Sequence, residues 1–316
     1  MTKKQLSVGI VGATGLIGRK FVKTLEKRKF PVGDLRLFAT KNSEGKIIHA
    51  FGKRFAVEKT DGNSFDGLDL VFFSAGRQAA EEYAPKAAKS GAVVIDNSSA
   101  FRMRPDVPLV IPEINIETAL HANAKIISNP NCSTIQAILP LANLYKEYGL
   151  KRLIISTYQA VSGNGQKGVN DLTRCRMGKT PLFYPVDIAK NCICKIGDVT
   201  ENGYTDEELK ARDETRKILS MPVEVSATCV RVPVENCHGV NVEAEFEKQA
   251  DINEVIARIY STEGVKLKNL PFAEFADGKD EVFVGRIRKS TAFKNGVAYF
   301  AVADNELKGA ALNAVQ

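Results

Sequence analysis

The sequence lacks the features that mark membrane proteins and secreted proteins. No stretch approaches the roughly 18 consecutive apolar residues that a membrane-spanning helix requires. Residues 1–5 run directly into a short strand pattern, without the apolar region of a secretory leader. From these two absences we expect a cytoplasmic protein with no membrane partner.

Cysteine and histidine are scarce, with six cysteines and three histidines in 316 residues. The cysteines do not follow the even spacing of a disulfide framework, so we expect reduced thiols. Cys175, Cys192 and Cys194 fall in one stretch, which makes a zinc site the alternative. A Cys-x-Cys pair without a second pair or a nearby histidine is a poor match to zinc spacing. We therefore expect no bound metal.

Basic residues outnumber acidic residues, and the formal net charge is +7. Clustered lysines and arginines would indicate nucleic-acid binding, but here they are dispersed. The basic runs are residues 27–29 and 286–289, and no aromatic side chains interleave with them. We therefore expect no nucleic-acid partner and regard small anionic molecules as the natural ligands.

The chain is long enough for two domains of roughly 150 residues each. In its first part, short apolar runs typical of buried parallel strands alternate with amphipathic helical patterns. The expected strands are residues 6–11, 35–39, 68–73 and 92–96, and the expected helices are residues 15–28 and 78–90. This alternation predicts a doubly wound (Rossmann) dinucleotide-binding domain over residues 1–130.

After residue 130 the pattern changes to longer strands, at residues 152–158, 223–232 and 240–246. Apolar and polar residues alternate in the last of these strands, which is typical of a sheet with one solvated face. We expect an α+β domain with a mixed sheet over residues 131–304. A final helix over residues 305–316 is expected to pack back on the first domain, and the fold class is α/β.

A glycine-rich loop, residues 12–18, joins the first expected strand to the first expected helix. In that position backbone N–H groups at the helix N-terminus hold a dinucleotide pyrophosphate, and a Cβ would block the phosphates. The spacing is Gly-x-x-Gly-x-x-Gly, so the interpretation depends on the flanking strand and helix. The expected cofactor contacts in this loop are Gly12, Thr14, Gly15, Leu16 and Ile17.

The end of the second expected strand distinguishes the two nicotinamide cofactors. NAD-specific proteins carry an acidic residue there, about twenty positions after the loop, which holds the ribose 2′-hydroxyl. This chain has Thr40, Lys41 and Ser43 instead of a carboxylate. Hydroxyl groups and a lysine suit a 2′-phosphate, which a carboxylate would repel, so NADP is favoured. A solvated loop is the alternative for these three residues.

Cys132 lies where another helical pattern begins. Polar residues 128–131 precede an apolar-periodic run that extends through Leu144. A cysteine in the first turn of a helix meets the positive end of the helix dipole, which favours thiolate over thiol. We therefore predict that Cys132 is a nucleophile. The other five cysteines are predicted to be small buried residues.

A thiolate nucleophile also needs a group that handles protons. His49 and His121 lie in segments typical of ordinary surface, whereas His238 follows a strand-like segment that contains Arg231. An imidazole there would take and return protons, and the guanidinium would bind a substrate carboxylate through two hydrogen bonds. We predict that both act together with Cys132.

Several segments together resemble the aspartate-semialdehyde dehydrogenase family. They are residues 12–18, 96–102 (DNSSAFR), 129–134 (NPNCST) and 158–163 (YQAVSG), together with Arg231 and His238. They occur in order from end to end of the chain, and the NPNCST segment is far more specific than the glycine loop. The resemblance implies that residues 131–304 form a catalytic and dimerisation domain, and that the protein is a homodimer or homotetramer. It also implies that the final helix continues past Gln316.

The resemblance implies roles for the matching positions. Cys132 would be the nucleophile, His238 the general acid/base, and Gln159 would orient the acyl group. Arg231 would bind the substrate α-carboxylate, and Glu207 would face the substrate amino group.

Further roles concern the phosphate group and the cofactor. By the same resemblance Arg102, Asn131 and Lys210 would hold the phosphate. A doubly anionic phosphoryl group needs cationic partners, which Arg102 and Lys210 provide. Ser162 and Gly163 would line the nicotinamide.

The implied activity is NADPH-dependent reductive dephosphorylation of L-aspartyl 4-phosphate to aspartate 4-semialdehyde and phosphate. It would serve the biosynthesis of lysine and diaminopimelate, threonine, methionine and isoleucine. One alternative is N-acetyl-γ-glutamyl-phosphate reductase, which typically has glycine at the position of Asn131 and does not need the Glu207 carboxylate. A non-catalytic dinucleotide-binding protein is the other, but such a protein should have lost Cys132, His238 or Arg231.

Overall fold

The first strand forms where the sequence concentrates apolar side chains. β1 (Leu6–Val11) buries Val8, Ile10 and Val11 almost completely. It pairs in parallel with β2 (Val32–Ala39) on one side and β5 (Leu70–Phe73) on the other. Side chains that point to either face of the sheet are buried, because a doubly wound sheet is covered on both faces. The computed structural model describes residues 4–122 and 124–316, so part of the segment inspected for a leader lies outside it.

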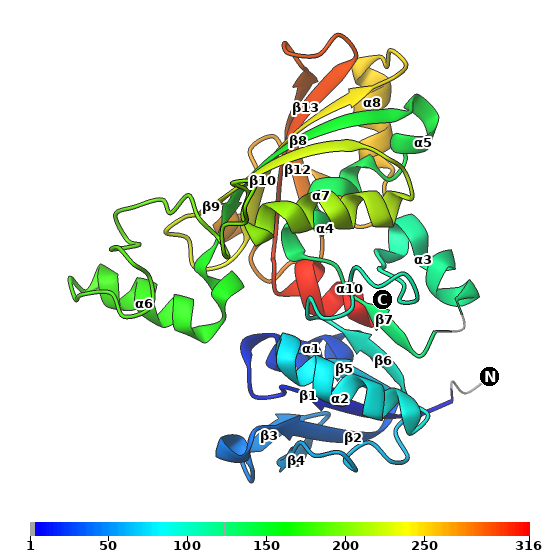
Figure 1. The fold of residues 1–316 in the computed structure, drawn as a ribbon, viewed down its shortest axis with the longest axis vertical. Helices are drawn as coiled ribbons and strands as arrows, with labels where there is room; N and C mark the ends of the chain where they lie inside the picture. The colour runs from blue at the N-terminus through cyan, green and yellow to red at the C-terminus, as the bar shows by residue number, and fades with distance from the viewer. Residues whose placement is uncertain (1–3, 123) are drawn as a thin grey trace. The chain divides into compact units, whose positions relative to one another are not determined.

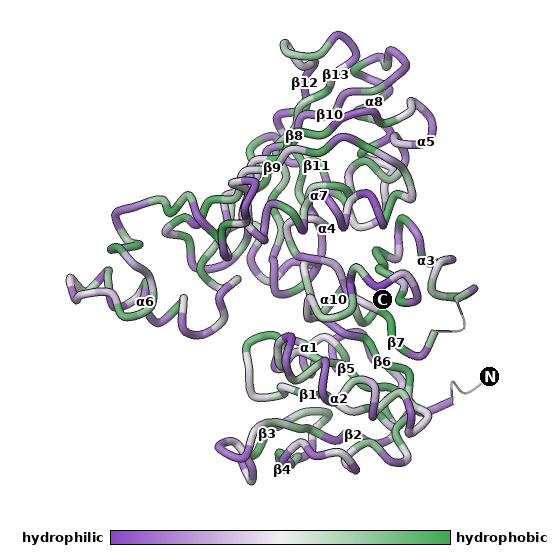
Figure 2. The backbone as a smooth tube through the Cα atoms, viewed as in Figure 1, coloured by the Kyte–Doolittle hydropathy of each residue, from purple (hydrophilic) through white to green (hydrophobic). Residues whose placement is uncertain are grey.

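The first sheet has seven strands in the order β3-β4-β2-β1-β5-β6-β7. All neighbouring pairs are parallel except β3 with β4. The remaining strands are β3 (Ile47–Ala50), β4 (Lys53–Lys59), β6 (Val93–Asp96) and β7 (Ile126–Ser128). The tube through β5, β6 and β7 is mostly green in Figure 2, as expected for strands with buried apolar residues. The doubly wound prediction is confirmed.

Helices cover both faces of this sheet. The helices are α1 (Leu16–Lys27), α2 (Arg77–Lys89), α3 (Pro112–His121) and, at the end of the chain, α10 (Leu312–Val315). Phe21 of α1 and Val315 of α10 share one apolar cluster with Val8, whereas Ala84 of α2 belongs to a second cluster with Val71. The β3–β4 hairpin was not predicted, because β3 is largely exposed and lacks a buried apolar run.

The second sheet has six strands in the order β11-β12-β13-β10-β8-β9. Its strands are β8 (Leu150–Gln159), β9 (Glu224–Arg231), β10 (His238–Phe246), β11 (Val265–Leu267), β12 (Val282–Lys289) and β13 (Gly296–Ala303). The pairs β8–β9 and β11–β12 are parallel and the others are antiparallel, so the predicted mixed sheet is confirmed.

Helices pack on the second sheet: α4 lies against the central strands β10, β13 and β8, and α7 lies against the edge strand β9 (Figure 1). The helices are α4 (Cys132–Ile138), α5 (Tyr145–Tyr148), α6 (Gln166–Arg176), α7 (Asp206–Leu219), α8 (Ile252–Tyr260) and α9 (Ala273–Ala276). The helix predicted from Cys132 through Leu144 ends early. Pro140 follows it in a short 3₁₀ turn, Leu139–Leu141, because proline cannot continue the hydrogen-bond pattern.

The chain divides into two compact units. The first is Met1–Pro130 with Ala310–Gln316, and the second is Asn131–Gly309. The return to the first unit therefore begins at Ala310 and not at residue 305. Asn305 stays in the second unit because its side chain bonds the Cys237 N–H and the Ser162 hydroxyl. None of the helices in the described part combines the length and apolar character needed to cross a bilayer.

Candidate active site

The loop between β1 and α1 lines a cavity of about 480 Å³ in the first unit. Gly12 has a φ of +85°, and a Cβ there would lie 2.8 Å from the Ser74 backbone. A Cβ on Gly18 would lie 2.1 Å from the Gly12 carbonyl oxygen. The loop and helix can approach each other only because both positions are glycine. Such a cradle of backbone next to a helix start fits a dinucleotide pyrophosphate.

Two lysines line the same cavity, and no acidic residue of the described chain does. Lys41 follows β2, as the sequence indicated. Lys59 was not predicted; it enters the cavity because β4 pairs in parallel with β2 and places Lys59 opposite Ala39. Only the strand pairing brings these two cations together, since they are far apart in the chain.

Most of the predicted cofactor contacts in the first unit line this cavity. They are Gly12, Thr14, Gly15, Thr40 and Lys41. Leu16, Ile17 and Ser43 are not among its lining residues. Ile17 packs against the apolar core, and the buried Ser43 hydroxyl contacts the side chains of Thr14 and Lys46.

Arg102 is also in the first unit, where it is almost fully buried. Its Nε donates to the Asn129 carbonyl at 2.9 Å, and one terminal nitrogen donates to the Asn97 carbonyl at 3.0 Å. The Asn129 side chain is in turn fixed by Asn97 and Asn313. Both of these hydrogen-bond acceptors are backbone carbonyls.

Cys132 is the first residue of α4, so the predicted helix start is confirmed. Asn131 caps the helix, and its side-chain oxygen accepts the N–H groups of Ser133 and Thr134. The backbone N–H of Asn131 donates to Glu214 at 2.7 Å. Cys132 is partly exposed, whereas the following residues of α4 are buried. The thiol therefore lies at the accessible end of an anchored helix.

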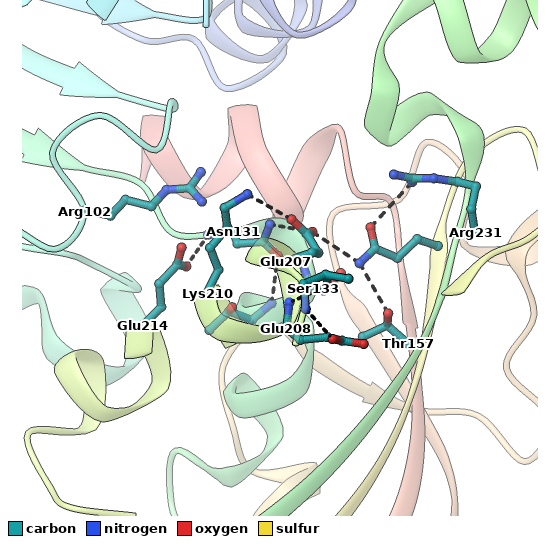
Figure 3. A network of polar contacts seen from close by, with 12 residues as sticks. Arg102, Asn131, Ser133, Thr157, Glu207, Glu208, Lys210, Glu214 and Arg231 are labelled. Atoms are coloured by element: carbon teal, nitrogen blue, oxygen red, sulfur yellow. Dashed lines mark hydrogen bonds and ion pairs between the residues drawn. The ribbon is translucent and has the colours of Figure 1, made fainter. Parts of the chain in front are cut away.

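A buried carboxylate, Glu207, lies beside this helix start. Thr205 caps α7 through a capping box with Glu208, which places Glu207 in the first turn. Its oxygens accept from Asn131 at 2.9 Å, Gln159 at 3.2 Å and Lys210 at 3.2 Å (Figure 3).

The electrostatic state of Glu207 follows from these partners. Burial alone would raise the pKa of its carboxyl, but Lys210, Asn131 and Gln159 hold that pKa below its ordinary value. Glu207 is therefore an ionised carboxylate inside the site, and the site can receive a cationic group.

Gln159 and Arg231 end two neighbouring strands. They are register partners in the parallel pair β8–β9. Arg231 is 3% exposed, and its Nη1 donates to the Ala160 carbonyl at 2.7 Å and to the Gln159 side chain at 3.5 Å. No carboxylate of the described residues pairs with it. A buried guanidinium without an acidic partner is costly unless a ligand supplies the anion.

His238 opens β10 and is fully buried. Its Nδ1 accepts the Ala160 N–H at 2.9 Å, and its Nε2 has no hydrogen-bond partner among the described residues. Burial, with a smaller contribution from Arg231, holds the pKa of the imidazole well below its ordinary value of 6.5. A Cβ on Gly163 would lie 3.4 Å from Nε2. The ring is therefore neutral, and its Nε2 borders the space above a glycine.

The predicted nicotinamide contacts, Ser162 and Gly163, lie in the second unit in a short 3₁₀ helix, Val161–Asn164. A Cβ on Gly163 would also lie 2.7 Å from Arg231 Nη1, so this glycine packs directly on the guanidinium. The Ser162 hydroxyl donates a hydrogen bond to the Asn236 side-chain oxygen and accepts one from the Asn305 side-chain amide. Asn305 was not predicted, because an asparagine after a strand carries no specific sequence signal.

Two more residues that support Cys132 were not predicted. Glu214, which is 1% exposed, anchors the Asn131 backbone, and only the packing of α7 beside α4 brings them together. Gly309 lies in a π-helical turn, Leu307–Ala311, and a Cβ there would lie 2.7 Å from the Cys132 Cβ. No motif marked either position.

The other five cysteines only partly match the prediction. Cys175, Cys229 and Cys237 are buried, but Cys192 and Cys194 are exposed, so the prediction of buried residues was wrong for these two. They lie in a segment outside the helices and sheets, where the apolar character of a cysteine does not predict whether it is buried. Burial raises the pKa of Cys229 to about 12, so that thiol is unreactive. His49 and His121 are exposed. Among residues 4–122 and 124–316 no group of side chains could hold a metal ion.

Comparisons with known proteins agree across the whole chain. The family model "Semialdehyde dehydrogenase, NAD binding domain" matches residues 7–122, and "Semialdehyde dehydrogenase, dimerisation domain" matches residues 141–308. An aspartate-semialdehyde dehydrogenase of Aquifex aeolicus is 47% identical over 325 residues, covering 98% of this chain and 96% of that protein. One from Bacillus subtilis is 42% identical over 332 residues, with the same two coverages.

A solved structure gives the same result. The structure of aspartate semialdehyde dehydrogenase II complexed with ASA from Vibrio cholerae is similar to this chain with a TM-score of 0.96. The two sequences are 40% identical, and the match covers 99% of this chain and 97% of that one.

Proposed function

The chain belongs to the aspartate-semialdehyde dehydrogenase family and is an NAD(P)-dependent oxidoreductase, and from that premise we propose that it works through a thioester on Cys132. The reaction is reductive dephosphorylation of L-aspartyl 4-phosphate to aspartate 4-semialdehyde, in the biosynthesis of the aspartate-derived amino acids. The observation that carries the proposal is a cluster of four functional groups in the second unit. A helix-start thiol, a buried carboxylate, an unpaired buried guanidinium and a neutral imidazole occur together there.

Two charged groups of the substrate match two charged groups of the protein. Arg231 would bind the α-carboxylate, because a buried guanidinium without an acidic partner gains most from a bidentate carboxylate. Glu207 would bind the α-ammonium, because its partners hold it ionised. An N-acetylated substrate has no such ammonium group, which supports the aspartyl substrate over the acetylglutamyl alternative.

The covalent step uses the thiolate of Cys132. Its sulfur attacks the acyl carbon, the C–S bond forms, and phosphate leaves with the electron pair of the C–O bond. Gln159 would orient the acyl group from the end of β8, and His238 supplies the imidazole of the site. Arg102, Asn131 and Lys210 would hold the phosphate, two of them as cations.

We infer that NADP is preferred to NAD. Lys41 and Lys59 give the dinucleotide cavity two positive charges, and Thr40 and Thr60 add hydroxyls, whereas no carboxylate of the described residues lines it. These lysines and hydroxyl groups attract a ribose 2′-phosphate, and they would not repel the other phosphate groups of NADP. The bound nicotinamide supplies the hydride that reduces the thioester carbon.

We also propose that the second unit forms a homodimer, with a tetramer of dimers as the larger assembly. The dimerisation-domain family match covers residues 141–308, and α4 and α7 pack against the sheet of this unit. Ile154 and Tyr158 of β8 are large exposed apolar side chains of that sheet, at 38% and 44% exposure. Exposed apolar side chains on a sheet are typical of a face that a second copy covers.

A phosphate-dependent assay tests the function. Aspartate semialdehyde, phosphate and NADP should give NADPH with the wild-type protein and none with Cys132→Ala. The exposed Cys192→Ala variant is the matched control and should keep full activity. Omitting phosphate should give a burst of NADPH equal to the number of active sites, and a mass increase on the peptide that contains Cys132. Appreciable turnover by Cys132→Ala would overturn the nucleophile assignment.

A further inference from the structure

We propose that Cys192 and Cys194 form a covalent modification site for low-molecular-weight disulfides. Exchange with such a disulfide joins the two thiols in an intramolecular disulfide and thereby weakens substrate binding at Arg231. The effect on binding rests on the proposed function, because that function gives Arg231 a carboxylate to bind. The covalent step does not depend on what the substrate is.

The two thiols lie on the solvent side of a short segment. Cys192 and Cys194 are exposed, and one residue, Ile193, separates them. Ile193 is partly buried and packs against Val161 and Leu172. Side chains alternate along extended backbone, so residues two positions apart point the same way. The two thiols are therefore neighbours on the face opposite Ile193, where a small molecule can reach them.

The backbone between the two cysteines supports Arg231. The Ile193 N–H donates to the Arg231 carbonyl at 2.9 Å, and the Arg231 N–H donates to the Ile193 carbonyl at 2.8 Å. These two hydrogen bonds make an isolated antiparallel bridge. Arg231 is the last residue of β9, which is the edge strand of its sheet. The bridge therefore holds the Arg231 backbone from the side that has no neighbouring strand.

A disulfide between the two cysteines does not fit this bridge. An antiparallel bridge needs extended backbone, in which residues two positions apart are about 6.6 Å apart along the strand. The side chains stand roughly perpendicular to the strand, so the Cβ atoms are separated by about the same distance, whereas a disulfide needs Cβ atoms about 3.8 Å apart. Ring closure must therefore bend the backbone at Ile193 and break its hydrogen bonds to Arg231.

The chemistry is thiol–disulfide exchange. The thiolate of one cysteine attacks the small disulfide, a new S–S bond forms, and one small thiolate leaves with the electron pair of the old bond. The second cysteine loses its proton and attacks the protein sulfur of this mixed disulfide, and the second small thiolate leaves. The two protein thiols lose two electrons, and the small disulfide becomes two thiols that take up the two protons. An exposed, strained disulfide is easily reduced, so the modification is reversible.

Mass spectrometry tests the covalent step. Trypsin cleaves after Lys190 and Lys195, and the released peptide, residues 191–195, contains both cysteines and no other. After incubation of the wild type with oxidised glutathione and blocking with iodoacetamide, this peptide should lack two hydrogen atoms and carry no carbamidomethyl group. Treatment with dithiothreitol before blocking should give two carbamidomethyl groups instead. A peptide that keeps free thiols or retains glutathione would overturn the proposal, whatever the substrate is.

Calorimetry tests the effect on binding, in the Cys132→Ala protein so that oxidation of the nucleophile cannot contribute. The Kd for aspartate semialdehyde should rise at least about tenfold after oxidation, because the guanidinium loses its alignment with the carboxylate, and should recover with dithiothreitol. Cys132→Ala combined with Cys194→Ser is the matched control. It can form only the mixed disulfide at Cys192, which leaves Ile193 extended, so its Kd should stay within about twofold.

The outcomes separate this proposal from the proposed function. A disulfide that leaves Kd unchanged would show that the bridge does not position Arg231, and an equal rise of Kd in the control would mean that ring closure is not the cause. Either result would overturn the proposal. If the proposed function is wrong, the reduced protein will not bind the semialdehyde at all. That result would overturn the effect on binding, and the mass measurement would still decide the covalent step.

Discussion

At the scale of single residues, the buried charges are what make the site specific. Among the described residues, Glu207 accepts hydrogen bonds from Asn131, Gln159 and Lys210, whereas Arg231 donates only to neutral groups. A protein normally avoids an unpaired buried charge, since no electrostatic attraction offsets the free-energy cost of desolvation. The two residues therefore differ in whether a bound ligand is needed to stabilise their charge. Glu207 is already stable in the empty site, and Arg231 gains most of its stabilisation from a bound carboxylate.

Arg231→Lys tests this difference. An ammonium cannot form two parallel hydrogen bonds with a carboxylate, and charged hydrogen bonds contribute about 1.5–3 kcal/mol each, so KM for the semialdehyde should rise roughly tenfold or more. Cysteine alkylation should be unchanged. Arg212→Lys is the control, because Arg212 pairs with Asp213 on the surface of α7. Steady-state kinetics give KM and kcat separately, and a fall in kcat alone would argue against carboxylate binding.

His238 should also affect how folding stability depends on pH. Its pKa is lower in the folded protein than in the unfolded chain, where it is near 6.5. Below about pH 6.5 the unfolded chain binds a proton that the folded protein does not, so stability falls as the pH drops. The limiting slope is about 1.4 kcal/mol per pH unit for one such group.

Urea unfolding of wild type and His238→Gln at pH 7 and pH 5.5 measures this effect. The wild type should lose more free energy of unfolding than the variant between these pH values, by about 1 kcal/mol. Both proteins are compared at one concentration, because the proposed dimer would make stability depend on protein concentration. Equal pH dependence in the two proteins would show that the imidazole is not buried and neutral.

At the scale of elements, the start of α4 is held by contacts that come from distant parts of the chain. Asn131 caps the helix locally, Glu214 anchors its backbone from α7, and Gly309 packs against Cys132 from the π-helical turn. The sequence indicated the cap, because an N-cap is a local signal. It did not indicate the other two contacts, because they depend on helix packing.

Gly309→Ala tests the packing contact. The added methyl group would lie 2.7 Å from the Cys132 Cβ, so the thiol or the turn has to shift. A displacement of the nucleophile by about 1 Å can lower turnover roughly a hundredfold, so kcat should fall strongly while cofactor binding is retained. Gly278→Ala serves as a control, because nothing lies within 4 Å of a Cβ there, although its φ of +72° adds backbone strain. If Gly309→Ala kept wild-type kcat, the contact would not matter for catalysis.

The β2–β4 pair gives a second example at this scale. Strand register places Lys59 opposite Ala39, so that Lys59 and Lys41 line the same dinucleotide cavity. Lys59→Ala should raise KM for NADPH roughly tenfold, since a charged contact to phosphate is lost, and should leave KM for NADH nearly unchanged. Lys53→Ala, on the same strand but outside the cavity, is the control. A parallel rise in both KM values would mean that Lys59 does not contact the 2′-phosphate.

At the scale of the whole molecule, each unit has its own hydrogen-bonded sheet and its own part of the chemistry. The first unit carries the dinucleotide cavity and Arg102, and the second carries the thiol, carboxylate, guanidinium and imidazole. Ile154 and Tyr158 of the second sheet are exposed in the single chain. The centroids of the Tyr158 and Phe300 rings are 5.9 Å apart. A second copy would cover these side chains.

Ile154→Arg combined with Tyr158→Arg should weaken the homodimer. Two charges in an apolar interface are expensive to bury, so the mass measured by light scattering at micromolar concentration should shift from dimer to monomer. Tyr260→Arg is the control, because Tyr260 is 69% exposed at the end of α8. A dimer that persists in the double variant would place the interface elsewhere.

Several features of the fold and the site depend only on local sequence pattern. The parallel strands of the first unit, the glycine turn, the mixed character of the second sheet and the helix start at Cys132 all follow from apolar periodicity, φ requirements and capping. The family motifs added the residues around the thiol. These signals can be recognised in the sequence because each depends on residues that are close together in the chain.

Contacts between residues far apart in the chain become visible only in the folded protein. Folding brought Lys59 into the dinucleotide cavity, set Glu214 and Gly309 against the start of α4, and exposed Cys192 and Cys194. It also joined the Ala160 peptide group to both Arg231 and His238. Strand register and helix packing create these contacts, and neither is encoded in any single stretch of the chain.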